Sequence, residues 1–146
     1  MNKKSSIKNV ILNKINKYIF TDINSKISQN SILDKIAKAL ENCSYILIVK
    51  FSLPSKKIVE LGQKIRQLCS IFNSLFIIVG RADIAVIVEA DGVLLNRNSY
   101  SFENAKKILS SDKFFGYLID NNEEQEKIES NLEFDFFVKM NEMKII

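Results

Sequence analysis

The chain has 146 residues, of which 47% are hydrophobic and 26% charged, enough for one domain with its own core. It contains no His, which excludes His general bases, His-activated nucleophiles and His-bound metals. Its two cysteines, Cys43 and Cys69, form no metal or redox motif, and no apolar run reaches the roughly 18 residues that span a bilayer. We therefore expect a cytoplasmic protein.

The net charge of +4 is concentrated at the amino terminus, where residues 1–17 carry five lysines and no acidic residue. Ile7, Ile11 and Ile15 recur at helical spacing, which predicts a basic amphipathic helix packed on the domain formed by residues 18–146. The alternative is an adaptor whose basic arm meets a membrane surface or an acidic partner. No aromatic or Arg cluster accompanies the lysines, so nucleic acid is not expected as a partner.

Beyond residue 17, short apolar runs alternate with segments of helical period, a pattern typical of parallel strands covered by helices. The predicted strands are 18–22, 44–51, 75–79, 92–95, 114–119 and 134–138. The predicted helices are 31–41, 55–71, 82–89, 101–109 and 122–131. Ser31 is the expected N-cap of the first of these helices, and Cys69 lies on the buried stripe of the second.

This order fits an open doubly wound sheet or part of a (β/α)8 barrel, and composition does not decide between them. The turn after the first strand, residues 21–24, contains no Gly, so dinucleotide-binding and P-loop motifs are absent. A more specific pattern lies in residues 76–85, FIIVGRADIA, and residues 89–95, EADGVLL. Both resemble the thiamine phosphate synthase and TenI family, in which the third strand ends in Asn-Asp-Arg and the fourth reads Ala-Asp-Gly-Val-His-Leu-Gly-Gln.

Three further landmarks follow the family's order: the strand 18–22, Leu53–Pro54 and Phe115–Gly116, so the resemblance covers residues 18–138. It implies a partial TIM barrel of about six parallel strands, with its site at their carboxyl ends. It also implies a transferase that joins a pyrimidine diphosphate to a thiazole phosphate. In such an enzyme carboxylates hold Mg²⁺, and cations cover the departing diphosphate.

The family's substrate-binding motif on the second strand, Gln-x-Arg-x-Lys, is replaced in this chain. Aligned through the loop that follows, it falls on Leu47, Val49 and Phe51, all of them apolar. Lys50 can substitute only if the strand slips by one residue, which turns its side chains to the opposite face. The Ser that meets phosphate on the fifth strand falls on Leu118.

The metal-binding residues are replaced as well. The Asn and Asp of the third strand fall on Val79 and Gly80, and the second metal-binding Asp falls near Ser99. A dication without a carboxylate is held very weakly, so no metal site is expected. Arg81 is the one matching site residue, and we expect it either to bind phosphate or to pair with Asp83.

The carboxyl-terminal part of the family's barrel is not found. Residues 139–143 replace the loop after the sixth strand, and the seventh and eighth strands, which usually build the phosphate site, are not found before Ile146. Strands one and six are then open edges. We expect a homo-oligomer, or another chain that completes the barrel.

The favoured hypothesis is a truncated, degenerate and non-catalytic family member that uses no cofactor. It binds a small phosphorylated ligand through Arg81 and Lys50. The alternative is an active thiamine phosphate synthase whose Mg²⁺ is held by displaced ligands, Asp22, Asp83 and Asp91. Asp91 is expected just before the fourth strand, away from the site. Thiazole isomerisation, the TenI reaction, depends on a His that this chain lacks.

Overall fold

The structure is a computed structural model that describes residues 18–42, 46–99, 101–120, 123, 125–129 and 133–146. The predicted helix of residues 1–17 lies outside the described residues. The strands are β1 Tyr18–Asn24, β2 Ile46–Ser52, β3 Leu75–Val79, β4 Gly92–Leu95, β5 Phe114–Leu118, β6 Phe136–Val138 and β7 Met143–Ile145. The helices are α2 Gln29–Asn42, α3 Ser55–Ile71, α4 Ala82–Ile87, α5 Phe102–Ile108, α6 Gln125–Glu129 and the short 3-10 helix Met140–Glu142.

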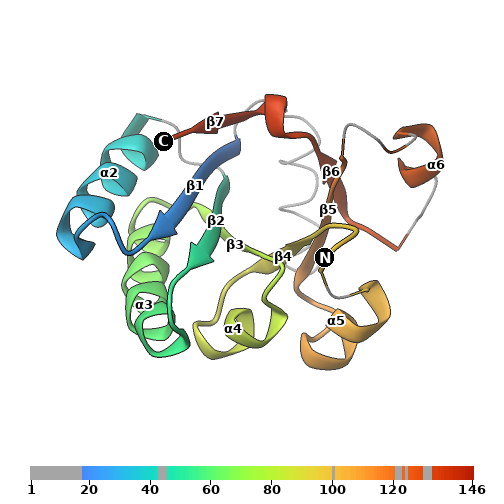
Figure 1. The fold of residues 1–146 in the computed structure, drawn as a ribbon, viewed down its shortest axis with the longest axis horizontal. Helices are drawn as coiled ribbons and strands as arrows, with labels where there is room; N and C mark the ends of the chain where they lie inside the picture. The colour runs from blue at the N-terminus through green and yellow to red at the C-terminus, as the bar shows by residue number, and fades with distance from the viewer. Residues whose placement is uncertain (1–17, 43–45, 100, 121–122, 124, 130–132) are drawn as a thin grey trace.

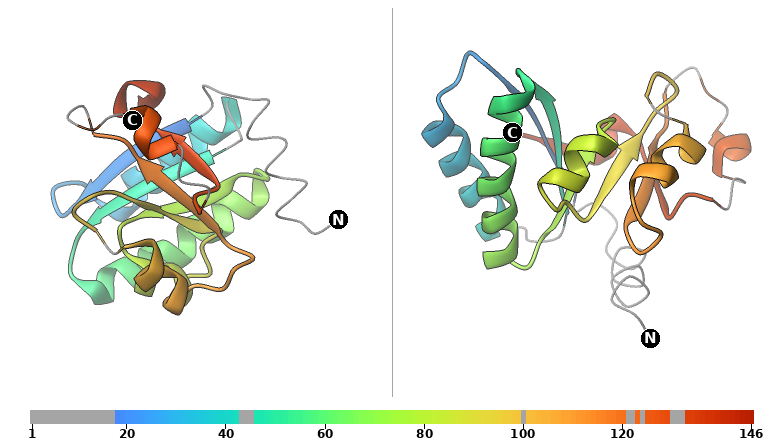
Figure 2. Two further views of the ribbon diagram at one scale, coloured as in Figure 1. Left: turned by 90° about the vertical axis from the view of Figure 1, so that its right-hand side faces the viewer. Right: turned by 90° about the horizontal axis from the view of Figure 1, so that it is seen from below.

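The strands form one parallel sheet in the order β6-β5-β4-β3-β2-β1-β7. From β1 to β6 each strand pairs with the next in sequence, and a helix covers each crossover between them. Helices α2 to α5 lie on the outer side of this curved sheet (Figure 1, Figure 2). The sheet therefore has the succession of strands and helices of a TIM barrel, as predicted.

The curvature of the sheet follows from its connectivity. β6 and β7 lie at opposite ends of the strand order, yet only residues 139–142 separate them. A link of this length reaches at most about 18 Å. The two edges must therefore approach each other, and the sheet curls into a partial barrel, with β7 crossing from the end of β6 to β1 (Figure 1).

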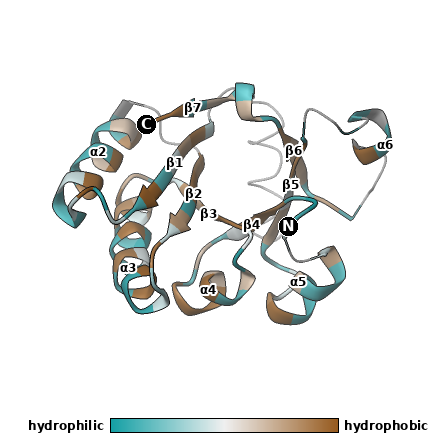
Figure 3. Cartoon of the chain, in the orientation of Figure 1, coloured by the Kyte–Doolittle hydropathy of each residue, from teal (hydrophilic) through white to brown (hydrophobic). Residues whose placement is uncertain are grey.

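Two cores lie on the two faces of the sheet. The helix-side core contains Leu47 and Val49 of β2 together with Ile58, Leu61 and Ile65, which form one stripe of α3. The inner core contains strand residues only: Tyr18, Phe20, Ile46, Ile48, Leu75, Ile77, Leu94, Phe114, Phe136, Val138 and Met143. Because both faces of most of the sheet are buried, the strands are mainly apolar, and polar residues interrupt them chiefly towards the ends of β1 and β2 (Figure 3).

The structure has the partial barrel of parallel strands that was predicted, with one strand more than the six expected. The open edge expected on β1 was wrong, because the additional strand β7 covers it. β7 pairs with β1 in the register Tyr18 to Met143, and the Ile146 N–H donates to the Phe20 carbonyl at 2.9 Å. The segment was missed because only Met143 of its three residues is buried. Among the described residues, β6 pairs with β5 alone, so its outer edge is available.

The first helix after β1 also begins earlier than predicted. α2 starts at Gln29, and the Ser31 N–H donates to the Ser28 hydroxyl at 3.2 Å. Ser28 is therefore the capping residue in place of Ser31. The bounds of β3 and β4 agree with the prediction, and Cys69 lies in the helix-side core as expected. No helix in the described part of the chain is long and apolar enough to cross a membrane.

Candidate functional site

Polar residues occupy the carboxyl ends of β1 and β2 on the inner face of the sheet. Ile46 and Ile48 belong to the inner core, so Lys50, two residues further along β2, lies on the same face. Asp22 is its register partner on β1. The Ser52 hydroxyl donates to Asp22 Oδ1 at 3.3 Å. The inner face thus changes from apolar to charged where a TIM barrel carries its site.

This placement corrects the prediction for Lys50. Leu47 and Val49 pack in the helix-side core, and Phe51 packs against it. The inner face of β2 therefore carries Lys50 without any slip of the strand. The alignment through Leu53–Pro54 is therefore wrong by one residue, because it places Leu47, Val49 and Phe51 on the inner face. Lys50 is exposed, and no ion pair joins it to another described residue.

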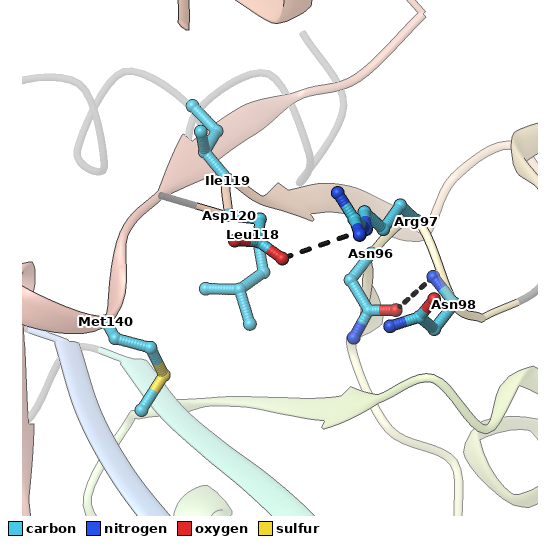
Figure 4. A pocket seen from close by; sticks show the side chains of 7 residues that line it. All are labelled: Asn96, Arg97, Asn98, Leu118, Ile119, Asp120 and Met140. Carbon is cyan, nitrogen blue, oxygen red and sulfur yellow. Dashed lines mark hydrogen bonds and ion pairs between the residues drawn. The ribbon is translucent and has the colours of Figure 1, made fainter. Parts of the chain in front are cut away.

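A cavity of about 260 Å³ opens at the carboxyl ends of β4, β5 and β6. Its lining residues are Asn96, Arg97, Asn98, Leu118, Ile119, Asp120 and Met140 (Figure 4). Leu118 and Met140 give it an apolar wall, and the amides and Arg97 give it a polar rim. Its volume is just below the range of about 300–1,000 Å³ typical of ligand sites, which suits one ring or one phosphate.

A hydrogen-bonded turn presents Arg97 at this cavity. The Asn98 N–H donates to Asn96 Oδ1 at 2.8 Å, and the Asn96 N–H donates to Ser99 Oγ at 2.9 Å. The Ser99 hydroxyl in turn donates to the Asn96 carbonyl at 3.0 Å. These local bonds fix the backbone on both sides of Arg97. Its side chain, 51% exposed, remains accessible to a ligand.

The opposite rim is held by Glu123. Its carboxylate accepts the Asp120 N–H at 2.9 Å and the Tyr117 hydroxyl at 2.6 Å. Burial, reinforced by the Glu123 carboxylate, raises the pKa of Tyr117 to about 12, so the phenol remains a donor at neutral pH. Asp120 Oδ2 lies 3.8 Å from Arg97 Nε, so an ion pair connects the two sides of the cavity (Figure 4).

Arg81 follows β3 and lies outside the residues that line this cavity. Its Nε and Nη2 donate to the two carboxylate oxygens of Asp83 at 3.1 and 3.0 Å. This hydrogen bonding is the main reason why the pKa of Asp83 is lowered. Of the two outcomes expected for Arg81, the structure contains the pairing with Asp83. Phosphate binding by Arg81 stays a prediction.

The two positions that the resemblance assigns to metal carboxylates lie side by side. A Cβ atom added to Gly80 would lie 3.5 Å from the Ser99 Cβ. Neither position carries a carboxylate, and within the described ranges no three His, Cys, Asp or Glu side chains are grouped to hold a metal. Of the nearby carboxylates, Asp83 is bound by Arg81, and Asp120 lies against Arg97. The residues present do not fit a carboxylate-held Mg²⁺ at this place.

Asp91 lies at the opposite, amino-terminal side of the sheet, as predicted. Its Oδ2 accepts the Phe76 N–H at 2.8 Å and a guanidinium N–H of Arg66 at 3.4 Å. It lines a second cavity of about 400 Å³ with Cys69, whose pKa is raised to about 12, chiefly by burial. The hydrogen bonds of Asp91 connect the start of β3 to the turn before β4, so Asp91 has a structural role.

Sequence reasoning missed Asn96, Arg97 and Asp120. Asn96 and Arg97 are the first two residues after β4, and Asp120 follows the buried Ile119 just beyond β5. Site residues of a β/α fold are expected at these places. Asn96 and Arg97 also stand where the fourth-strand motif of the family continues with Gly-Gln. The replacement of this Gly-Gln by Asn96-Arg97 is visible in the sequence and could have indicated these two site residues.

Known proteins resemble this chain over the whole β/α body. A family profile described as thiamine monophosphate synthase matches residues 17–138. The thiamine-phosphate synthase of Methanosarcina barkeri is 31% identical over 123 residues, which are 84% of this chain and 54% of that protein. The thiamine-phosphate synthase of Clostridium perfringens strain 13 is 30% identical over 110 residues, 73% of this chain and 51% of that protein.

A solved structure shares the fold. The thiamine phosphate pyrophosphorylase from Pyrococcus furiosus superposes with a TM-score of 0.70 at 27% identity, over 85% of this chain and 60% of that one. The chain spans about half the length of the curated relatives it matches. Since the family profile covers most of the curved sheet and its helices, the chain belongs to the thiamine monophosphate synthase family.

Proposed function

We propose that this chain makes thiamine phosphate, by joining a pyrimidine diphosphate to a thiazole phosphate at the carboxyl ends of its strands. The observation that carries the proposal is the family match over residues 17–138, which includes every strand from β1 to β6. Relatives that share this part of the chain are named thiamine-phosphate synthases.

The charges at the carboxyl ends of the strands suit these substrates. A departing diphosphate carries several negative charges, so cations must cover its oxygens. Lys50 stands on the inner face of β2, and Arg97 stands on the rim of the cavity beyond β4. The apolar wall of Leu118 and Met140 offers a surface on which a small heteroaromatic ring can pack.

We propose that association with another polypeptide completes the barrel. Among the described residues, β6 has a partner on one side only, so its backbone groups can pair with a further strand. A second copy of this chain, or a chain with further β/α units, can supply that strand. Sedimentation of the purified protein checks this, since a strict monomer at micromolar concentration contradicts self-association.

A second candidate function is the binding of a phosphorylated ligand without catalysis. It is favoured by Gly80 and Ser99, the adjacent positions that lack the metal carboxylates, and by the engagement of Arg81 with Asp83. Both functions use the same surface of the sheet. They differ in whether product forms.

The test is an incubation of the purified chain with both substrates, followed by mass spectrometry for thiamine phosphate. Product above a no-protein control is expected, and Lys50→Gln should reduce its rate by about tenfold or more, the effect of one lost charged hydrogen bond. Lys56→Gln, an exposed lysine on α3, is the matched control and should leave the rate unchanged. A folded chain that binds both substrates by calorimetry and yields no product supports the second candidate.

A further inference from the structure

We propose that Arg97 binds the phosphate of the ligand in this protein directly, without a divalent metal. That the ligand is phosphorylated rests on the proposed function. The phosphate-binding property itself belongs to the cavity beyond β4 and β5, and it can be measured without catalysis.

The first observation is the pairing of the two altered positions. A Cβ atom built on Gly80 would lie 3.5 Å from the Ser99 Cβ, so the turns that carry these residues face each other. The Gly80 N–H also donates to the Leu94 carbonyl at 2.9 Å, which ties the end of β3 to β4. The two turns therefore lie together, and neither Gly80 nor Ser99 offers a carboxylate to a dication.

The second observation is that the turn of Ser99 also carries a cation, Arg97, at the position where the family motif has Gln. Arg97 lies two residues before Ser99, and the hydrogen bonds between Asn96, Asn98 and Ser99 fix the backbone around it. A guanidinium offers five N–H donors in a planar fork that matches phosphate oxygens. Within the described ranges its one ion pair is the 3.8 Å contact from Nε to Asp120, which leaves both terminal nitrogens for a ligand.

Arg81 is less suited to this role. Its Nε and Nη2 both donate to Asp83 at close to 3 Å, so a phosphate would have to compete with a bidentate carboxylate. Arg97 makes one long contact instead, and it lines the cavity, where a phosphate also meets the amides of Asn96 and Asn98. Of the two arginines, Arg97 is therefore the one that we assign to phosphate binding in this cavity.

Asp120 makes the inference sharply testable. It attracts Arg97, and at the same time it repels an anion that enters the cavity. Arg97→Gln removes the attraction for phosphate, whereas Asp120→Asn removes the repulsion and frees Arg97. Both variants break the same ion pair, so damage to the rim alone would weaken binding in both.

The experiment is isothermal calorimetry of inorganic pyrophosphate with the full chain, in EDTA and in Mg²⁺. We expect binding in EDTA, weakened about tenfold or more by Arg97→Gln and tightened about threefold by Asp120→Asn. Lys107→Gln on α5 removes the same charge away from the cavity and should leave the affinity unchanged. Circular dichroism verifies that each variant is folded.

Three results would overturn the inference: pyrophosphate binding that requires Mg²⁺, an Arg97→Gln affinity equal to that of the parent chain, or an equal loss in Lys107→Gln. The proposed function fails separately. A chain that binds pyrophosphate through Arg97 and forms no thiamine phosphate keeps this inference and loses the catalytic proposal. A chain that forms thiamine phosphate but binds pyrophosphate only in the presence of Mg²⁺ keeps the catalytic proposal and loses this inference.

Discussion

Replacement of Asp91 tests the structural role assigned to this carboxylate. Its side chain is only 11% exposed, and one oxygen, Oδ2, accepts both the Phe76 N–H at 2.8 Å and the Arg66 guanidinium at 3.4 Å. Asp91→Ala removes this oxygen and with it both hydrogen bonds. Asp91→Asn keeps an amide oxygen for the Phe76 N–H and removes the charge that faces Arg66.

The two substitutions should differ in magnitude. A buried backbone N–H left without a partner costs about 1–3 kcal/mol, and the partly exposed Arg66 pair adds at most about 1 kcal/mol. We expect Asp91→Ala to lower the free energy of unfolding by about 3 kcal/mol and Asp91→Asn by about 1 kcal/mol. With a urea m-value of about 1.5 kcal/mol/M, the unfolding midpoints fall by about 2 M and 0.7 M.

Urea unfolding followed by circular dichroism measures both shifts. Equal losses in the two variants, or a loss below about 0.5 kcal/mol in Asp91→Ala, would refute the assignment of the Phe76 hydrogen bond as the main contribution. Pyrophosphate affinity of the folded variants is the functional control. It should be unchanged, because Asp91 lies at the amino-terminal side of the sheet.

Three further predictions concern packing, the last strand and pH. Gly116→Ala should lower the free energy of unfolding in urea by about 1–3 kcal/mol, because the added Cβ would clash with the Phe136 ring, and an unchanged midpoint would contradict that close packing. Met143→Asp should destabilise by about 2 kcal/mol or more by placing a charge in the inner core, whereas Lys144→Asp on the exposed side of β7 should stay within about 0.5 kcal/mol. Burial raises the pKa of Tyr117 from 10.0 to about 12, so its contribution to stability is complete below pH 10 and is lost as the pH rises towards 12. A stability difference from Tyr117→Phe that does not change over that pH range would contradict it.

Much of the β/α body is predictable from the sequence because its strands are sharply bounded. The apolar run of β3 lies between Ser74 and Gly80, and β4 lies between Asp91 and Asn96, so their limits follow from polarity alone. β7 has no such signal. Met143 is its one buried side chain, and only the tertiary pairing with β1 makes the segment a strand.

The candidate site is less predictable, since it depends on which face each residue takes. When the family motif is aligned one residue off along β2, residues of the helix side are assigned to the inner face, and Lys50 is assigned to the wrong face. The positions of Ile46 and Ile48 in the inner core show which face Lys50 takes. The approach of Gly80 to Ser99 joins turns distant in sequence and comes from the folded sheet.

The most direct test of the proposed catalytic activity is thiamine phosphate formation by the purified, folded chain, given both substrates and followed by mass spectrometry. We expect product above the no-protein control, in EDTA as well as in Mg²⁺, and a much lower rate in Arg97→Gln. No product in either buffer from a chain shown to be folded would contradict it.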